Sequence, residues 1–82
     1  MSPTVLRYKN YRFFFFSREE RRIHVHVYSS DGEAKFWLEP KIELAEYTGF
    51  NNVQIAEIDK IITNHFNEIK HAWHKYFGSR SN

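Results

Sequence analysis

The 82-residue sequence contains no cysteine, which excludes a disulfide framework and a cysteine-ligated zinc site. It also has no apolar run near the roughly 18 residues of a membrane-spanning helix, and we expect neither membrane association nor a targeting segment. Small secreted domains usually need disulfides, so we expect a cytoplasmic protein. Common enzyme signatures, such as a glycine-rich phosphate loop or a nucleophile elbow, are missing as well.

What the sequence does have is enough apolar and aromatic material for one small core, with 41% hydrophobic and 18% aromatic residues. We predict a single domain over residues 1–78, followed by a disordered tail at 79–82. The charge is uneven. Residues 1–28 carry six basic and two acidic side chains, whereas the remainder carries six basic and eight acidic ones. The basic part could face nucleic acid or an acidic protein, although a solvated hairpin tip at "SREERR" explains it as well.

The first half of the chain has the pattern of short antiparallel strands. β-branched and aromatic residues dominate segments 4–8, 11–17, 22–29 and 33–39, and turn residues separate them at Lys9-Asn10 and at 30–32. Pro40 should end the fourth strand, because proline cannot donate to a ladder. Residues 41–49 fit either a fifth edge strand or a short helical turn.

The second half predicts one amphipathic helix from residue 53 to 77, capped by Asn51 or Asn52. Its apolar stripe comprises Val53, Ile55, Ile58, Ile62, Phe66, Ile69, Trp73 and Tyr76. Such a helix is about 37 Å long, so it should overhang strands of about 23 Å unless it bends. The predicted fold is α+β with two layers: an antiparallel meander of four or five strands, and one long C-terminal helix packed across one face.

The strand alternation separates a core face from an open face, which is the sheet face opposite the helix. We expect Ile58, Ile62, Phe66 and Ile69 to be buried against Val25, Val27, Phe36 and Leu38. The predicted open face comprises Arg12, Phe14, Phe16, His24, His26, Tyr28, Lys35 and Trp37. This set is too aromatic for a surface that meets only water.

Three uses of the open face fit these residues. RNA bases could stack on its rings while its cations meet phosphates. A protein partner or a second copy of the chain could cover it. Alternatively, the segment 41–49 could fold back over it. The binding candidates are Arg12, Phe14, Tyr28, Lys35 and Trp37.

His24 and His26 are the candidate catalytic residues, as acid and base or as phosphate donors, because they share a face and titrate near neutral pH. On an open face they need only water, so replacing both by alanine should cost no more than about 1 kcal/mol. Two imidazoles fall short of the three or four ligands that zinc requires. We therefore expect neither a metal nor a cofactor.

The blocks "HVHV" at 24–27 and "GEAKFWLEP" at 32–40, with Trp73 near the end of the helix, resemble the bacterial family labelled domain of unknown function 4160. Members usually have proline just before the first histidine, where this chain has Ile23. The resemblance implies a small prokaryotic protein, often encoded beside a domain of unknown function 2442 as a toxin–antitoxin pair. This chain would be the toxin, and a small antitoxin-like protein would be its partner.

Together these observations predict a toxin-like component that acts on RNA or the translation apparatus through the open face, with an activity resembling that of a metal-independent ribonuclease. The alternative is a non-catalytic interaction module whose open face is covered by a partner or by a second copy.

Overall fold

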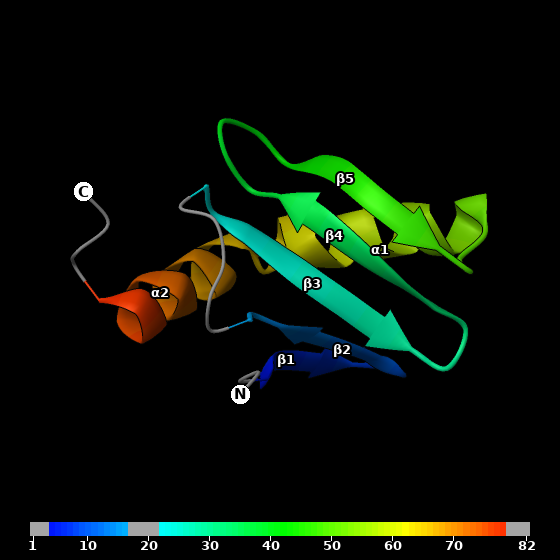
Figure 1. Cartoon of the computed structure of the whole chain (residues 1–82), viewed down its shortest axis with the longest axis horizontal. Helices are drawn as coiled ribbons and strands as arrows, with labels where there is room; N and C mark the ends of the chain where they lie inside the picture. Colours follow the sequence, from blue (N-terminus) through cyan, green and yellow to red (C-terminus); the bar gives the residue numbers. More distant parts are fainter. Residues whose placement is uncertain (1–3, 17–21, 79–82) are drawn as a thin grey trace.

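The computed structural model describes residues 4–16 and 22–78, so the predicted tail and most of "SREERR" lie outside the described residues. Five strands form one antiparallel sheet in the order β1-β2-β3-β4-β5, followed by two helices (Figure 1). The elements are β1 (Thr4–Tyr8), β2 (Tyr11–Phe14), β3 (His24–Ser29), β4 (Gly32–Trp37), β5 (Glu43–Thr48), α1 (Asn52–Asn64) and α2 (Phe66–Phe77). The predicted α+β class and the meander are confirmed, and residues 43–48 supply the fifth strand rather than a cover for the open face.

The connection from β5 to α1 is fixed by a close contact between two glycines. A Cβ atom on Gly32 would lie 2.3 Å from the carbonyl oxygen of Thr48, and Gly49 has a positive φ of 89°. Only glycine fits such an approach without displacing the backbone. α1 then begins at Asn52 and is capped by Asn51, one of the two predicted caps. The side-chain oxygen of Asn51 accepts a hydrogen bond from the backbone N–H of Gln54 at 2.8 Å.

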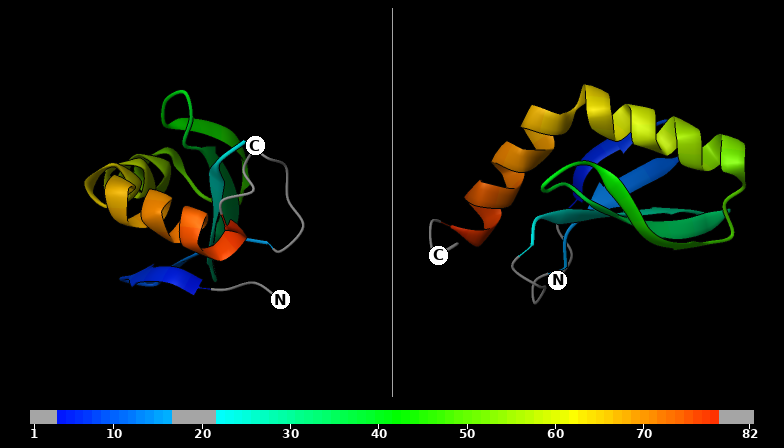
Figure 2. Two further views of the ribbon diagram at one scale, coloured as in Figure 1. Left: turned by 90° about the vertical axis from the view of Figure 1, so that its left-hand side faces the viewer. Right: turned by 90° about the horizontal axis from the view of Figure 1, so that it is seen from above.

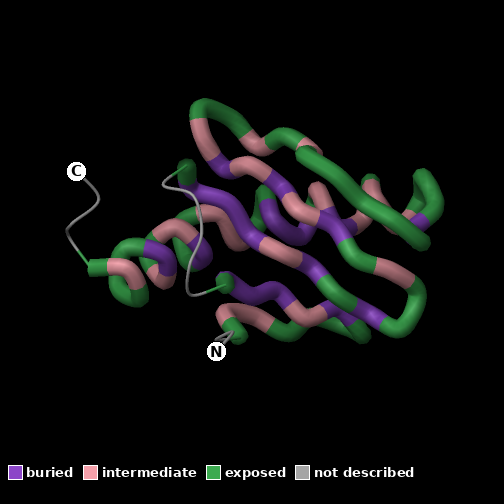
Figure 3. Tube along the Cα trace, viewed as in Figure 1, coloured by how far each residue is buried: buried purple, intermediate pink, exposed green. Residues whose placement is uncertain are grey.

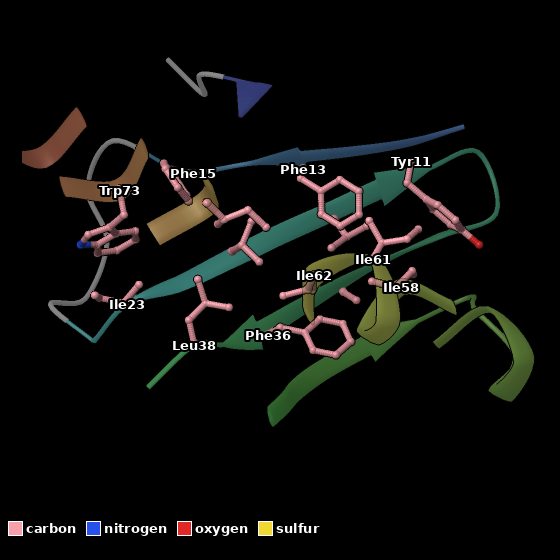
Figure 4. Packing of buried hydrophobic residues seen from close by; sticks show 14 of the residues in the cluster. Tyr11, Phe13, Phe15, Ile23, Phe36, Leu38, Ile58, Ile61, Ile62 and Trp73 are labelled. Carbon is pink, nitrogen blue, oxygen red and sulfur yellow. The ribbon is translucent and has the colours of Figure 1, made fainter. Parts of the chain in front are cut away.

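The core lies between the sheet and the two helices, where the predicted stripe meets the strands (Figure 4). Ile58, Ile62 and Ile69 have no exposed surface, whereas Phe66 is only partly buried. The strand residues predicted to receive them, Val25, Val27, Phe36 and Leu38, are all buried. The assignment of Val53 to this stripe is wrong, because it is 77% exposed. It precedes Ile58 by five residues, which places it about 140° around the helix axis.

The prediction of one long helix is also wrong, because the chain breaks at His65 into α1 and α2. His65 has φ −116° and ψ 22°, and its backbone N–H is shared between the carbonyl oxygens of Ile61 and Ile62 at 3.1 and 3.2 Å. The break falls in a run of poor helix formers, Thr63-Asn64-His65. It also keeps the helical segment on a sheet too short for a straight helix. Seen from above, α2 turns away from α1 and passes the end of the sheet where β3 begins (Figure 2).

Candidate functional site

The strand register brings the predicted site residues together in three rows across the open face. Arg12 pairs with Tyr28, which pairs with Glu33. Phe14 pairs with His26, which pairs with Lys35, and His24 pairs with Trp37. All seven predicted catalytic and binding residues therefore lie on one surface, because partners in an antiparallel ladder point to the same side of the sheet.

His26 occupies the middle of the open face between two phenylalanines. Its ring is stacked on that of Phe14, with centroids 5.5 Å apart, and meets the edge of Phe16 at 4.4 Å. Phe14 is itself only 9% exposed, and the guanidinium of Arg12 lies 4.6 Å from its ring centroid. Tyr28 and Phe16 are the more accessible rings, at 47% and 41% exposure.

His24 is placed on the predicted side of the sheet, but the expectation that it meets water is wrong. Its side chain has no exposed surface, and its Nδ1 lies 2.6 Å from the carbonyl oxygen of Arg22. Since a carbonyl oxygen only accepts, Nδ1 carries the proton in this contact. The rings of Trp73 and Trp37 lie 5.1 and 5.5 Å from that of His24.

The burial of His24 follows from the break at His65. α2 passes the end of the sheet (Figure 2), and the ring of its Trp73 contacts that of His24, the first residue of β3. Trp73 also contacts Phe15, with ring centroids 5.1 Å apart, and is only 4% exposed. In this conformation His24 cannot touch a substrate, whereas His26 keeps partial exposure. The assignment of acid and base roles to this pair stays a prediction.

Two cationic side chains lie against the ring of Trp37. The guanidinium carbon of Arg22 lies 4.1 Å from its ring centroid, and the Lys35 Nζ lies 4.4 Å from it. Arg22 is held in place by a hydrogen bond from Nε to the carbonyl oxygen of Glu39 at 2.8 Å. A cation above an indole ring is stabilised by the ring quadrupole and remains able to meet an anion from solution.

Charge is divided across the open face. Arg7 on β1 lies directly opposite Arg12 on β2, so the β1–β2 side carries two arginines in register. Towards β5 the face carries acidic side chains instead, with Glu33 opposite Thr48, Lys35 opposite Glu46 and Trp37 opposite Glu43. β5 is exposed along most of its length and forms one edge of the sheet (Figure 3).

Arg7 also lies on this surface, although it is not among the residues predicted for the open face. The signal was available, because the two-residue turn at Lys9-Asn10 pairs Tyr8 with Tyr11 and therefore Arg7 with Arg12. Metal ligands do not gather here: within residues 4–16 and 22–78, no three histidine, aspartate or glutamate side chains come together to hold an ion.

The strongest electrostatic coupling lies on the helix side, away from the open face. Lys9 Nζ and the Tyr11 hydroxyl both contact the carboxylate of Glu57, at 2.6 and 2.9 Å. Burial, followed by the contact with Glu57, raises the pKa of Tyr11 to about 12. The hydrogen bonds from Lys9 and Tyr11 lower the pKa of Glu57, and the same contact raises the pKa of Lys9. This cluster joins α1 to the β1–β2 turn.

Fold and surface together define a small two-layer α+β domain with a mixed aromatic and charged sheet face. The chain belongs to the family described as Domain of unknown function (DUF4160), whose sequence profile matches residues 10–74. This confirms the resemblance drawn from the histidine and tryptophan blocks. The comparison with curated proteins found no match, and neither did the comparison with solved structures. Among the described residues, no helix is long and apolar enough to cross a membrane.

Proposed function

We propose that this chain is the toxin-like component of a prokaryotic toxin–antitoxin pair and that it binds single-stranded RNA through the open face. The observation that carries the proposal is the pairing of cations with aromatic rings on the open face: Arg12 lies over Phe14, and Arg22 and Lys35 lie over Trp37. Surfaces that bind single-stranded RNA combine stacking rings with cations in this way.

The proposed contacts divide between two kinds of side chain. Tyr28 and Phe16 have enough exposed ring to stack a base. Arg12 pairs with Tyr28 and Lys35 pairs with His26 in the register, and both would supply charge for phosphates. His26 lies at the centre of the open face, where the bound RNA would pass, and is the residue we assign to any proton transfer. His24 supports the surface from below, because its ring is fully buried.

A binding assay tests this proposal directly. Anisotropy of a fluorescent, unstructured 12-nucleotide RNA should report an affinity that falls about tenfold in Tyr28→Ala, because stacking of one base contributes about 1–3 kcal/mol. Tyr8→Ala is the matched control, since Tyr8 is 42% exposed but packs against His65 on the helix side. Equal losses in both variants, or no RNA binding by the wild-type protein, would contradict the proposal.

The toxin role has a separate test in cells. Expression of this chain alone should inhibit growth, and co-expression with the neighbouring gene should relieve the inhibition. Tyr28→Ala should inhibit less than the wild-type chain at equal protein level. Growth that is unaffected by the wild-type chain would refute the toxin role without bearing on RNA binding.

A second candidate function is supported by the acidic side of the open face. Glu33, Glu43 and Glu46 gather on β4 and β5 beside an exposed sheet edge, where phosphate would be repelled. We propose that a basic partner protein, in the antitoxin role, docks here, or that a second copy covers the face. Glu46→Gln should weaken binding of the co-expressed neighbouring protein and leave RNA affinity unchanged or higher. The opposite pattern would argue against a protein interface.

A further inference from the structure

We infer that Arg7, Arg12, Tyr28 and Ser30 form a binding site for a phosphate group of RNA at the β1–β2 side of the open face. This inference rests on the RNA binding proposed above and names the residues that would hold the backbone. Arg7 lies before the residues matched by the family profile, so the site is argued from this chain alone.

The position of the two arginines favours an anion site. Arg7 and Arg12 are direct partners in the β1–β2 ladder, where Cβ atoms of opposed residues lie about 5 Å apart. Like charges at this position are destabilising. Within the described residues Arg7 takes part in no ion pair. An anion bound at this position would be attracted by both side chains.

The Arg12 side chain is already fixed in place by its neighbours. Its Nε donates to Thr4 Oγ1 at 2.6 Å, and its guanidinium rests on the Phe14 ring at 4.6 Å. These contacts reduce the side-chain entropy that binding would otherwise remove. The planar guanidinium group also matches the geometry of phosphate oxygens.

The surface around the two arginines also suits an anion. Arg7 and Arg12 line one hollow together with Thr4, Asn10, Tyr28 and Ser30. These neighbours offer hydroxyl and amide groups, and no carboxylate lines the hollow. The hollow nearer β5, by contrast, combines Lys35 with the carboxylates of Glu33 and Glu46. The β1–β2 hollow therefore suits an anion better than the hollow nearer β5.

Tyr28 lies in the same row of the sheet as the two arginines. Tyr28 pairs with Arg12, which pairs with Arg7, so the ring and the two cations follow one line across three strands. A phosphate at the arginine pair leaves the adjoining base free to stack on the exposed Tyr28 ring. The phosphate could be an internal phosphodiester or a terminal phosphate, and the two differ in charge.

The test is the salt dependence of RNA binding. For single strands the slope of log K against log salt changes by about 0.7 for each phosphate contact. Arg7→Gln should therefore flatten the slope by about 0.7 and lower affinity at low salt. Arg7→Lys, which keeps the charge, should stay close to the wild-type slope. Lys60→Gln, which removes an exposed charge from α1, should leave the slope unchanged.

Two RNAs distinguish the sources of the phosphate. If the site holds a terminal phosphate, a 5′-phosphorylated 12-nucleotide RNA should bind more tightly than its 5′-hydroxyl form, and Arg7→Gln should abolish the difference. Equal binding of the two forms, with the slope still flattened, assigns the site to a backbone phosphodiester.

The outcomes separate this inference from the proposed function. If wild-type protein binds RNA through Tyr28 and Arg7→Gln has the wild-type slope and affinity, the arginine site is wrong and the proposed function stands. If wild-type protein binds no RNA, both are overturned. A urea midpoint for Arg7→Gln at or above the wild-type value would confirm that the variant is folded, since the change removes a like-charge pair.

Discussion

Replacing His24 by alanine tests the most consequential contact of the open face. The expectation from strand alternation alone was a surface site with a small effect on stability. The structure instead places the ring in full burial, between Trp37 and Trp73, with a hydrogen bond to the carbonyl oxygen of Arg22. We therefore expect His24→Ala to destabilise the fold.

The magnitude follows from two contributions. Loss of an intramolecular hydrogen bond costs about 1 kcal/mol net, and the Arg22 carbonyl would need a new donor. The missing ring leaves a cavity, and buried side chains of similar size cost about 2–5 kcal/mol when truncated to alanine. We expect a total of about 3–6 kcal/mol. That is a large share of the stability of a domain this small.

Urea denaturation measures this change, followed by far-ultraviolet circular dichroism and by tryptophan fluorescence. Both tryptophans of the chain flank His24, so the emission of the folded variant should also shift. The matched control is His71→Ala, because His71 is exposed on α2 and should change stability by no more than about 0.5 kcal/mol. A cost below about 1 kcal/mol for His24→Ala, with unchanged emission, would refute the reasoning.

Three further predictions test the core, the electrostatics and the backbone. Ile62→Ala should cost about 2–5 kcal/mol in urea unfolding, whereas Val53→Ala, at a 77% exposed position, should cost less than about 0.5 kcal/mol. Because the pKa of Tyr11 is raised from 10.0 to about 12, the stability it contributes is complete below pH 10 and lost as pH rises through 12. Alkaline titration of the urea midpoint should show this loss in the wild type and not in Tyr11→Phe. Gly32→Ala should lower the melting temperature, because a Cβ atom at that position would lie within 3 Å of the backbone of Thr48, Gly49 and Phe50.

Local patterns predicted most of the sheet. Alternation assigns Arg12, Phe14 and the β3 and β4 residues to the correct faces, because side-chain direction in a strand has a period of two whatever surrounds it. The turns and the cap at Asn51 depend on residues close in sequence, which a pattern can read. The face and the partners of each predicted binding residue follow from the same register.

The path of the C-terminal helical segment could not be predicted in this way. No proline or glycine interrupts residues 53–77, and the low propensity of Thr63-Asn64-His65 is a weak signal by itself. The break depends on fitting the segment to the length of a twisted sheet. The burial of His24 depends on that break in turn, because Trp73 on α2 covers it. The strand pattern alone therefore could not predict that His24 is buried.

The break at His65 also links two surfaces that a straight helix would have kept apart. Trp73 contacts Phe15 and His24 at once, so any opening that lifts α2 uncovers the end of the core and one row of the open face together. Such openings are visible as amide hydrogen exchange. A ligand that binds the open face only while Trp73 covers His24 must slow the exchange of α2 amides, although it touches none of them. Exchange in α2 therefore becomes a remote reporter of occupancy on the opposite side of the sheet.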